Sequence, residues 1–251
     1  MRPRHLVLPL LLSACSSTPD PKETPTSGTA SAETAEEVDL AADCTAFEAA
    51  TMYGETRGLA VFDEKRELEA RDTDYGGLRL SDPKAKEIVA AYKAHFDKAI
   101  AEQPKLAAAI AAPGADVQAI QRQQLEAMNP SEPLVAWKTL CEPHADKTGT
   151  SKRAKCSALA RTSYTALRFA PFNPEKAKAA VEMAASLSAE VGGDAAGVGA
   201  QLATDVAAIE AEAERLKASF SDGAHRAHHD AIKRLLDETG GRIEKACGSR
   251  F

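Results

Sequence analysis

The sequence predicts an all-α fold, in which antiparallel helices pack into a bundle. From residue 36 onward, apolar residues recur at spacings of three and four, the periodicity of helices with one buried face. No stretch alternates apolar and polar residues between turn signals, as half-buried strands do. Aromatic residues make up only 5% of the chain, and such a composition suits closely packed, alanine-rich helices better than a β-sandwich. We therefore expect residues 36–251 to form a single helical domain.

The first predicted helices lie before residue 141. One follows a stripe of apolar and small residues from Leu40 to Leu68, although two glycines weaken its middle. The next has strong start signals, because Asp82 is a helix-capping residue and Pro83 suits the first helical position. We expect that helix to end at Pro104. Shorter helices are expected over residues 116–128 and 134–140.

Four more helices complete the predicted domain, over residues 151–170, 174–191, 202–220 and 224–246. In the helix over residues 202–220, apolar residues alternate spacings of four and three, like the heptads of a coiled coil. This pattern covers only about two and a half heptads, fewer than a free coiled coil needs, so we expect a bundle helix. The glycine-rich residues 192–199 are predicted to be a flexible connector, since they follow a helix and lack the ending of a phosphate-binding loop.

The predicted helix over residues 151–170 is basic. It has no acidic residue, and its cations are Lys152, Arg153, Lys155, Arg161 and Arg168. These side chains could face anionic lipid, or they could be solvated or paired within the protein. We favour solvated or intramolecular cations, with acidic residues between 205 and 214 as the partners.

The first fifteen residues, MRPRHLVLPLLLSAC, have the order of an export leader. Two arginines precede the apolar residues 6–12, which are too few to span a bilayer about 30 Å thick. The next residues, Leu12-Ser13-Ala14-Cys15, resemble the lipobox of bacterial lipoprotein signal peptides. That resemblance implies cleavage after Ala14 and diacylation, with chains such as palmitate, of the Cys15 sulfur. The alternative is an ordinary secretory leader that happens to contain a cysteine.

The lipobox resemblance also implies a location. Residues 1–14 would be the signal peptide, and acyl chains on Cys15, at about 0.8 kcal/mol per buried methylene, would hold the protein on a membrane. Residues 15–35 contain no large apolar residue and are rich in serine, threonine and proline, as disordered tethers are. In Gram-negative lipoproteins, a serine such as Ser16 after the cysteine favours the outer membrane. We therefore expect a lipid-anchored envelope protein that faces the periplasm or the cell surface.

Charge and motifs narrow the class of function. The chain has 31 Lys and Arg against 37 Asp and Glu, and loss of the two leader arginines changes its net charge from −6 to −8. An acidic protein is a poor candidate for nucleic-acid binding. The sequence lacks G-x-S-x-G, H-E-x-x-H and comparable catalytic motifs. It therefore predicts a non-enzymatic structural or protein-interaction module, whose envelope partner it does not identify.

Four cysteines follow Cys15. An even number in an exported chain predicts two disulfides among Cys44, Cys141, Cys156 and Cys247. Three pairings are open. The short loop between Cys141 and Cys156 favours a bond between these two, which leaves Cys44 to join Cys247 and so tie the first helix to the last. Metal binding by these cysteines is the weaker alternative, because no C-x-x-C pair is present.

Two histidines of the last helix are candidate metal ligands. Continuing its apolar stripe backward from Ile232 reaches His229 and His225, which would project inward at one end of the bundle. Two histidines at this spacing can share a divalent transition metal. Otherwise they are half-exposed residues that end the stripe. A metal- or small-ligand-binding module that uses this end of the bundle is therefore the alternative function.

Overall fold

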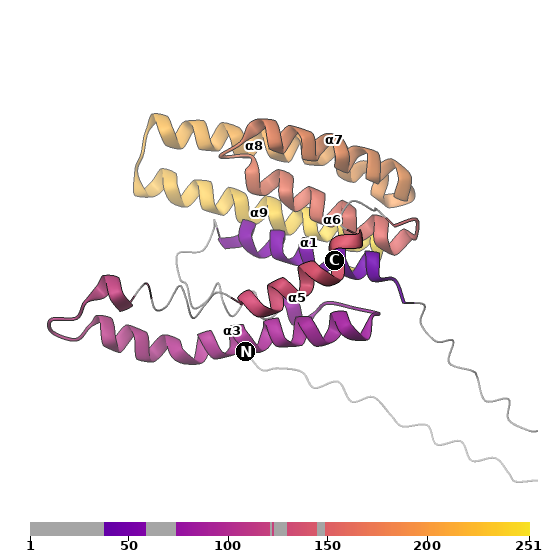
Figure 1. Cartoon of the computed structure of the whole chain (residues 1–251). Coiled ribbons are helices and arrows are strands. Elements are labelled where there is room, and N and C mark those ends of the chain that lie inside the picture. The colour runs from indigo at the N-terminus through magenta and orange to yellow at the C-terminus, as the bar shows by residue number, and fades with distance from the viewer. Residues whose placement is uncertain (1–37, 59–73, 121, 123–129, 145–148) are drawn as a thin grey trace, which may run out of the picture. The chain divides into compact units, whose positions relative to one another are not determined.

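The computed structural model describes residues 38–58, 74–120, 122, 130–144 and 149–251 (Figure 1). The predicted signal peptide, Cys15 and the predicted tether lie outside these ranges. So do residues 59–68 of the helix expected to end at Leu68 and most of residues 116–128. Throughout the described ranges the regular structure is helical, with no strand, which confirms the all-α class. None of the helices in these ranges has the length and apolar character needed to cross a membrane.

The helices belong to one compact unit, Glu36–Phe251. Those described are α1 (Leu40–Gly58), α3 (Pro83–Ile110), α5 (Ser131–Cys141), η1 (Glu142–His144), α6 (Lys152–Phe169), α7 (Pro174–Val191), η2 (Gly193–Gly197), α8 (Val198–Ala218) and α9 (Asp222–Cys247). Predicted caps begin two of them. Asp82 accepts a hydrogen bond from the backbone N–H of Ala85, and Asn173 accepts one from that of Lys176.

One helix extends beyond its predicted end, and another continues through a pair of glycines. α3 continues through Pro104 to Ile110, over a run of alanines with high helix propensity. α9 continues through its glycine pair and ends before Gly248, whose φ of 77° is a left-handed conformation that glycine adopts readily. Gly240 is buried within α9, and a Cβ there would lie 3.0 Å from Nε of Arg250. Its lack of a side chain therefore leaves room for the arginine.

The region around α8 differs from expectation at both ends. The predicted flexible connector is wrong, because residues 192–199 include η2 and the start of α8. At Gly199, α8 approaches α7 so closely that a Cβ on this residue would lie 2.5 Å from Cα of Ala185 in α7. The predicted heptad stripe is buried from Leu202 to Ala213, but Phe220 lies beyond the end of α8 and is 72% exposed.

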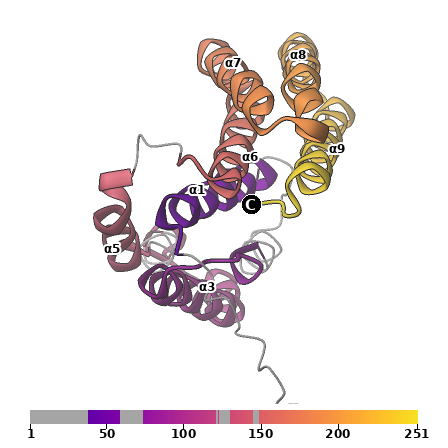
Figure 2. The same ribbon diagram turned by 90° about the vertical axis from the view of Figure 1, so that its right-hand side faces the viewer.

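Two hydrophobic cores lie on opposite sides of α1 (Figure 2). In the α3/α5 core, Phe47 of α1 is surrounded by aromatic rings, with centroids 4.2 Å from that of Trp137 and 5.2 Å from that of Tyr92. In the α6–α9 core, Ala49 and Tyr53 of α1 belong to one cluster with leucine, isoleucine and alanine side chains of the four later helices, of which α6 and α9 contact α1 directly. α1 is therefore shared by both cores.

Each core has its own disulfide. Cys44 bonds Cys141 and Cys156 bonds Cys247, with Cα–Cα distances of 5.7 and 5.9 Å. The favoured pairing of Cys141 with Cys156, and of Cys44 with Cys247, is wrong. Cys141 ends α5 and faces α1 in the α3/α5 core, whereas Cys156 lies in the second turn of α6 and meets the end of α9. The two cysteines are close in sequence, but their helices pack into different cores.

A buried carboxylate joins three helices at one end of the unit. Asp43 of α1 has no exposed surface. It accepts hydrogen bonds from the backbone N–H groups of Ser81 and Asp82 at the start of α3, and its Oδ1 lies 2.7 Å from Nη2 of Arg153 in α6. These donors satisfy the charge away from water and fix where α3 and α6 begin relative to α1.

Candidate binding cleft

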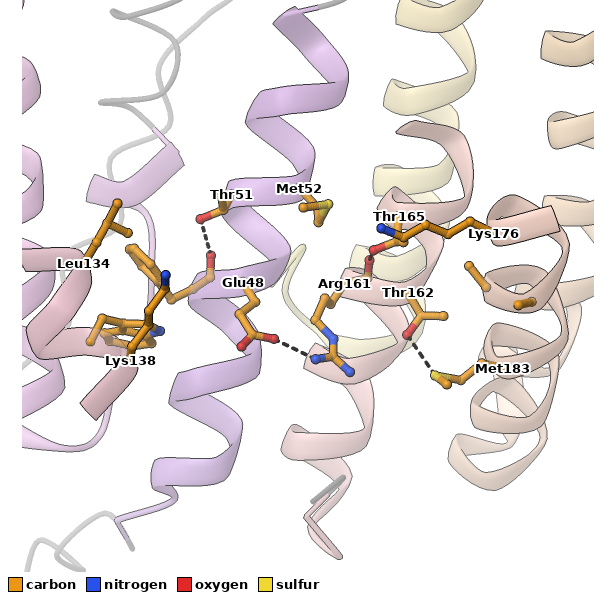
Figure 3. Close-up of a pocket in the computed structure, with 14 residues that line it drawn as sticks. Glu48, Thr51, Met52, Leu134, Lys138, Arg161, Thr162, Thr165, Lys176 and Met183 are labelled. Atoms are coloured by element: carbon orange, nitrogen blue, oxygen red, sulfur yellow. Dashed lines mark hydrogen bonds and ion pairs between the residues drawn. The ribbon is translucent and has the colours of Figure 1, made fainter. Parts of the chain in front are cut away.

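A cleft of about 480 Å³ opens between α5 and α7 (Figure 3). α1 and α6 form its floor. In Figure 3, Leu134 and Lys138 of α5 lie on one side, and Lys176 and Met183 of α7 lie on the other. The lining residues are Phe47, Glu48, Thr51, Met52, Leu134, Trp137, Lys138, Arg161, Thr162, Thr165, Lys176, Ala179, Ala180 and Met183. This volume is within the usual range of small-molecule sites, roughly 300–1,000 Å³.

Much of the lining is apolar, and part of it is exposed. Phe47 and Trp137 are buried at the α5 side, where they also belong to the α3/α5 core. On the α7 side, Met183 is 52% exposed. Methionine is unbranched and polarisable, so it adapts to apolar ligands of different shape. The cleft therefore presents apolar surface to solvent.

The charged residues of the cleft are mainly cationic. Nη1 of Arg161 lies 2.6 Å from Oε2 of Glu48, so this arginine is paired across the floor. Lys138 and Lys176 are exposed, and neither makes an ion pair with a carboxylate of the described residues. Nζ of Lys176 lies 3.6 Å from the ring centroid of Phe169, a cation–π contact. Three cations and one carboxylate give the lining a net charge of +2, although the chain is acidic.

One donor in the lining lacks a partner. Trp137 is only 4% exposed, and its indole Nε1–H makes no hydrogen bond within the described structure. The hydroxyls of Thr51 and Thr165 donate to the backbone carbonyls of Phe47 and Arg161, and neither accepts from the indole. The indole nitrogen has almost no accessible surface, so an acceptor in the open cleft does not reach it.

The fold explains why Arg161 is in the cleft. Four of the five cations of α6 pair with carboxylates of its neighbours α1 and α7, and Lys152 is exposed: the pairs are Arg153–Asp43, Lys155–Glu190, Arg161–Glu48 and Arg168–Glu55. This confirms that the basic helix is paired within the protein. The predicted partners, between residues 205 and 214, are wrong, because α6 turns its cations toward α1 and α7 instead of α8.

The structure brings the two predicted metal ligands together. Nε2 of His225 and Nε2 of His229 are 3.0 Å apart on α9, and both side chains are half-buried. The inward residue is His228, which is 7% exposed, because the position four residues before Ile232 faces α8 more directly than the position three before it. Burial lowers the pKa of His228. Within the described ranges, no cluster of three or more His, Cys, Asp or Glu could hold a metal ion.

The sequence does not predict the cleft. Its lining comes from four helices whose residues lie far apart in the chain, and no single segment has a recognisable motif. The available signals are weak: the only tryptophan of the chain lies beside a lysine in a short helix, and Met183 interrupts the polar face of α7. No protein-family model, curated protein or solved structure matches this chain. Its function is therefore inferred from the residues of the cleft.

Proposed function

We propose that this protein is a lipid-anchored, non-enzymatic binding module of the bacterial envelope. Cys15 would hold it at the membrane, as its lipobox resemblance implies, and the α5/α7 cleft would hold an apolar partner. The observation that carries the proposal is an open cleft with an apolar lining and two lysines that lack carboxylate partners. The Thr51 and Thr165 hydroxyls donate to backbone carbonyls and Glu48 is paired with Arg161, so none of them forms a nucleophile–base pair, which favours binding over catalysis.

The anchor is tested by fractionation. We expect the full-length protein to sediment with membranes and to incorporate an alkyne analogue of palmitate. The Cys15→Ser variant should lose the label and leave the membrane fraction. Labelling that survives this substitution would contradict the anchor.

The cleft is tested in the host with a photo-crosslinking amino acid at position 179. Ala179 is exposed on α7 and lines the cleft, whereas Ala189 is exposed on the same helix and does not. We expect a discrete adduct, with lipid or protein, from position 179 and none from position 189. Equal labelling at both positions, or no adduct at either, would refute a binding role for the cleft.

A second candidate function is metal binding by His225 and His229. It is favoured by the 3.0 Å separation of their Nε2 atoms, since two ligand nitrogens about 2.0–2.1 Å from zinc lie only slightly farther apart. Titration calorimetry with Zn²⁺ should give one site that disappears in the His225→Ala/His229→Ala variant. Absence of heat at micromolar zinc, or heat that persists in the variant, would exclude this function.

A further inference from the structure

We propose that the cleft binds a single-chain amphiphile with an anionic head group, such as a long-chain fatty acid. This inference rests on the proposed function, because it names the chemical class of the partner that the cleft holds. It follows from two properties of the lining: its apolar composition and the sign of its charge.

The apolar part of the cleft suits an acyl chain. Phe47 and Trp137 provide flat aromatic surface on the α5 side, and Met52 and Met183 provide flexible thioethers over the floor and the opposite wall. Such side chains accommodate an extended hydrocarbon without strict shape matching. A volume of about 480 Å³ also lies within the range of small-molecule sites.

The charges favour an anion at the mouth of this apolar space. Lys138 on α5 and Lys176 on α7 approach the cleft from opposite sides, and Arg161 lies on the floor between these walls (Figure 3). Only Arg161 has a carboxylate partner, Glu48. An acidic head group would therefore gain two cations without displacing an existing ion pair. A neutral or cationic head group would leave the +2 lining uncompensated.

Trp137 also provides the assay, since it is the only tryptophan of the chain. We would titrate the full-length protein with palmitate, below its critical micelle concentration, and follow tryptophan fluorescence. We expect saturable binding that is weaker for hexadecanol and weaker still for hexadecyltrimethylammonium. Each lysine would donate a charge-assisted hydrogen bond to the palmitate carboxylate and so contribute to its affinity. Lys138→Ala/Lys176→Ala should therefore weaken palmitate binding about tenfold or more. Ala179→Phe should block it by filling the cleft.

The matched controls are Lys178→Ala/Lys233→Ala and Ala189→Phe. These residues are exposed helical positions outside the cleft, so the controls should bind palmitate like the parent protein. Circular dichroism and the unfolding midpoint of each variant would show that the fold is retained.

Two results would overturn the inference and leave the proposed function in place. If hexadecanol bound as tightly as palmitate and the lysine variants had no effect, the cleft would be apolar without selecting an anion. If palmitate did not bind, but a designed acidic amphipathic helix changed Trp137 fluorescence in the parent and not in Ala179→Phe, the cleft would be a protein groove. Failure of all these probes, together with no crosslink from position 179, would refute both proposals.

Discussion

Replacing Cys44 and Cys141 together by alanine should lower the free energy of unfolding by about 4–5 kcal/mol. The bond closes a loop with a sequence separation of 97 residues, and in the chain-entropy model a loop of about 100 residues contributes about 4.7 kcal/mol. The second bond closes a loop of nearly equal separation, 91 residues. Its removal by Cys156→Ala/Cys247→Ala should therefore cost about the same. Because the loops follow one another and do not overlap, the two losses should add in the quadruple variant.

The assay is urea unfolding of each variant, followed by far-ultraviolet circular dichroism, in a Cys15→Ser background. The same samples allow a thiol titration in denaturant. Under the observed pairing, the Cys44→Ala/Cys141→Ala variant keeps an intact bond between Cys156 and Cys247 and has no free thiol. A variant with two titratable thiols would refute the pairing. Unequal losses of several kcal/mol would refute the assumption that loop entropy dominates.

Three further predictions concern single residues. Asp43→Ala should destabilise the domain by about 2–4 kcal/mol in urea unfolding, because it leaves buried backbone donors and a cation without their acceptor; a loss below about 1 kcal/mol would contradict that role. Burial lowers the pKa of His228 in the folded protein, so as pH falls this histidine is protonated in the unfolded chain before it is protonated in the folded one. The free energy of unfolding should therefore decline as pH drops from about 6.5, the ordinary pKa of histidine, to the lower pKa of the folded state. This pH dependence should vanish in His228→Leu. Gly199→Ala should cost about 1–3 kcal/mol through its clash with Ala185, whereas Gly197→Ala, with nothing within 4 Å, should cost little; equal effects would show that helix propensity, not crowding, decides.

Local features of the fold could be predicted from the sequence. Asp82 and Asn173 are capping residues followed directly by proline, and both begin helices where this local chemistry places them. The stripe from Leu202 to Ala213 is buried because its period matches that of a helix packed on one face. These predictions depend only on residues within one or two turns of each other.

Features that depend on distant contacts could not be predicted in this way. The cysteine pairing follows from the position of α1 between two cores. The distance between two cysteines in the sequence does not show to which core each one belongs. His228 is buried, and His225 and His229 are only half-buried, because of how α9 is rotated about its axis against α8. The apolar stripe of α9 defines that rotation only to within one residue. The cleft is a still clearer case, since Lys138, Arg161 and Lys176 come to line one cleft only when α5 and α6 pack on α1 and α7 packs on α6.

The order of the disulfides also has a mechanical consequence. A tension applied across the helical unit would pass from Cys44 to Cys141 and from Cys156 to Cys247 through covalent bonds, so neither loop could be stretched. Within this path, residues 142–155 are the only peptide that bears load, and at about 3.5 Å per residue they extend to about 50 Å. Pulling would therefore separate α1, α3 and α5 from α6–α9 as two closed blocks. Their shared boundary, between α1 and α6, is the floor of the cleft, so such a separation would divide the binding site.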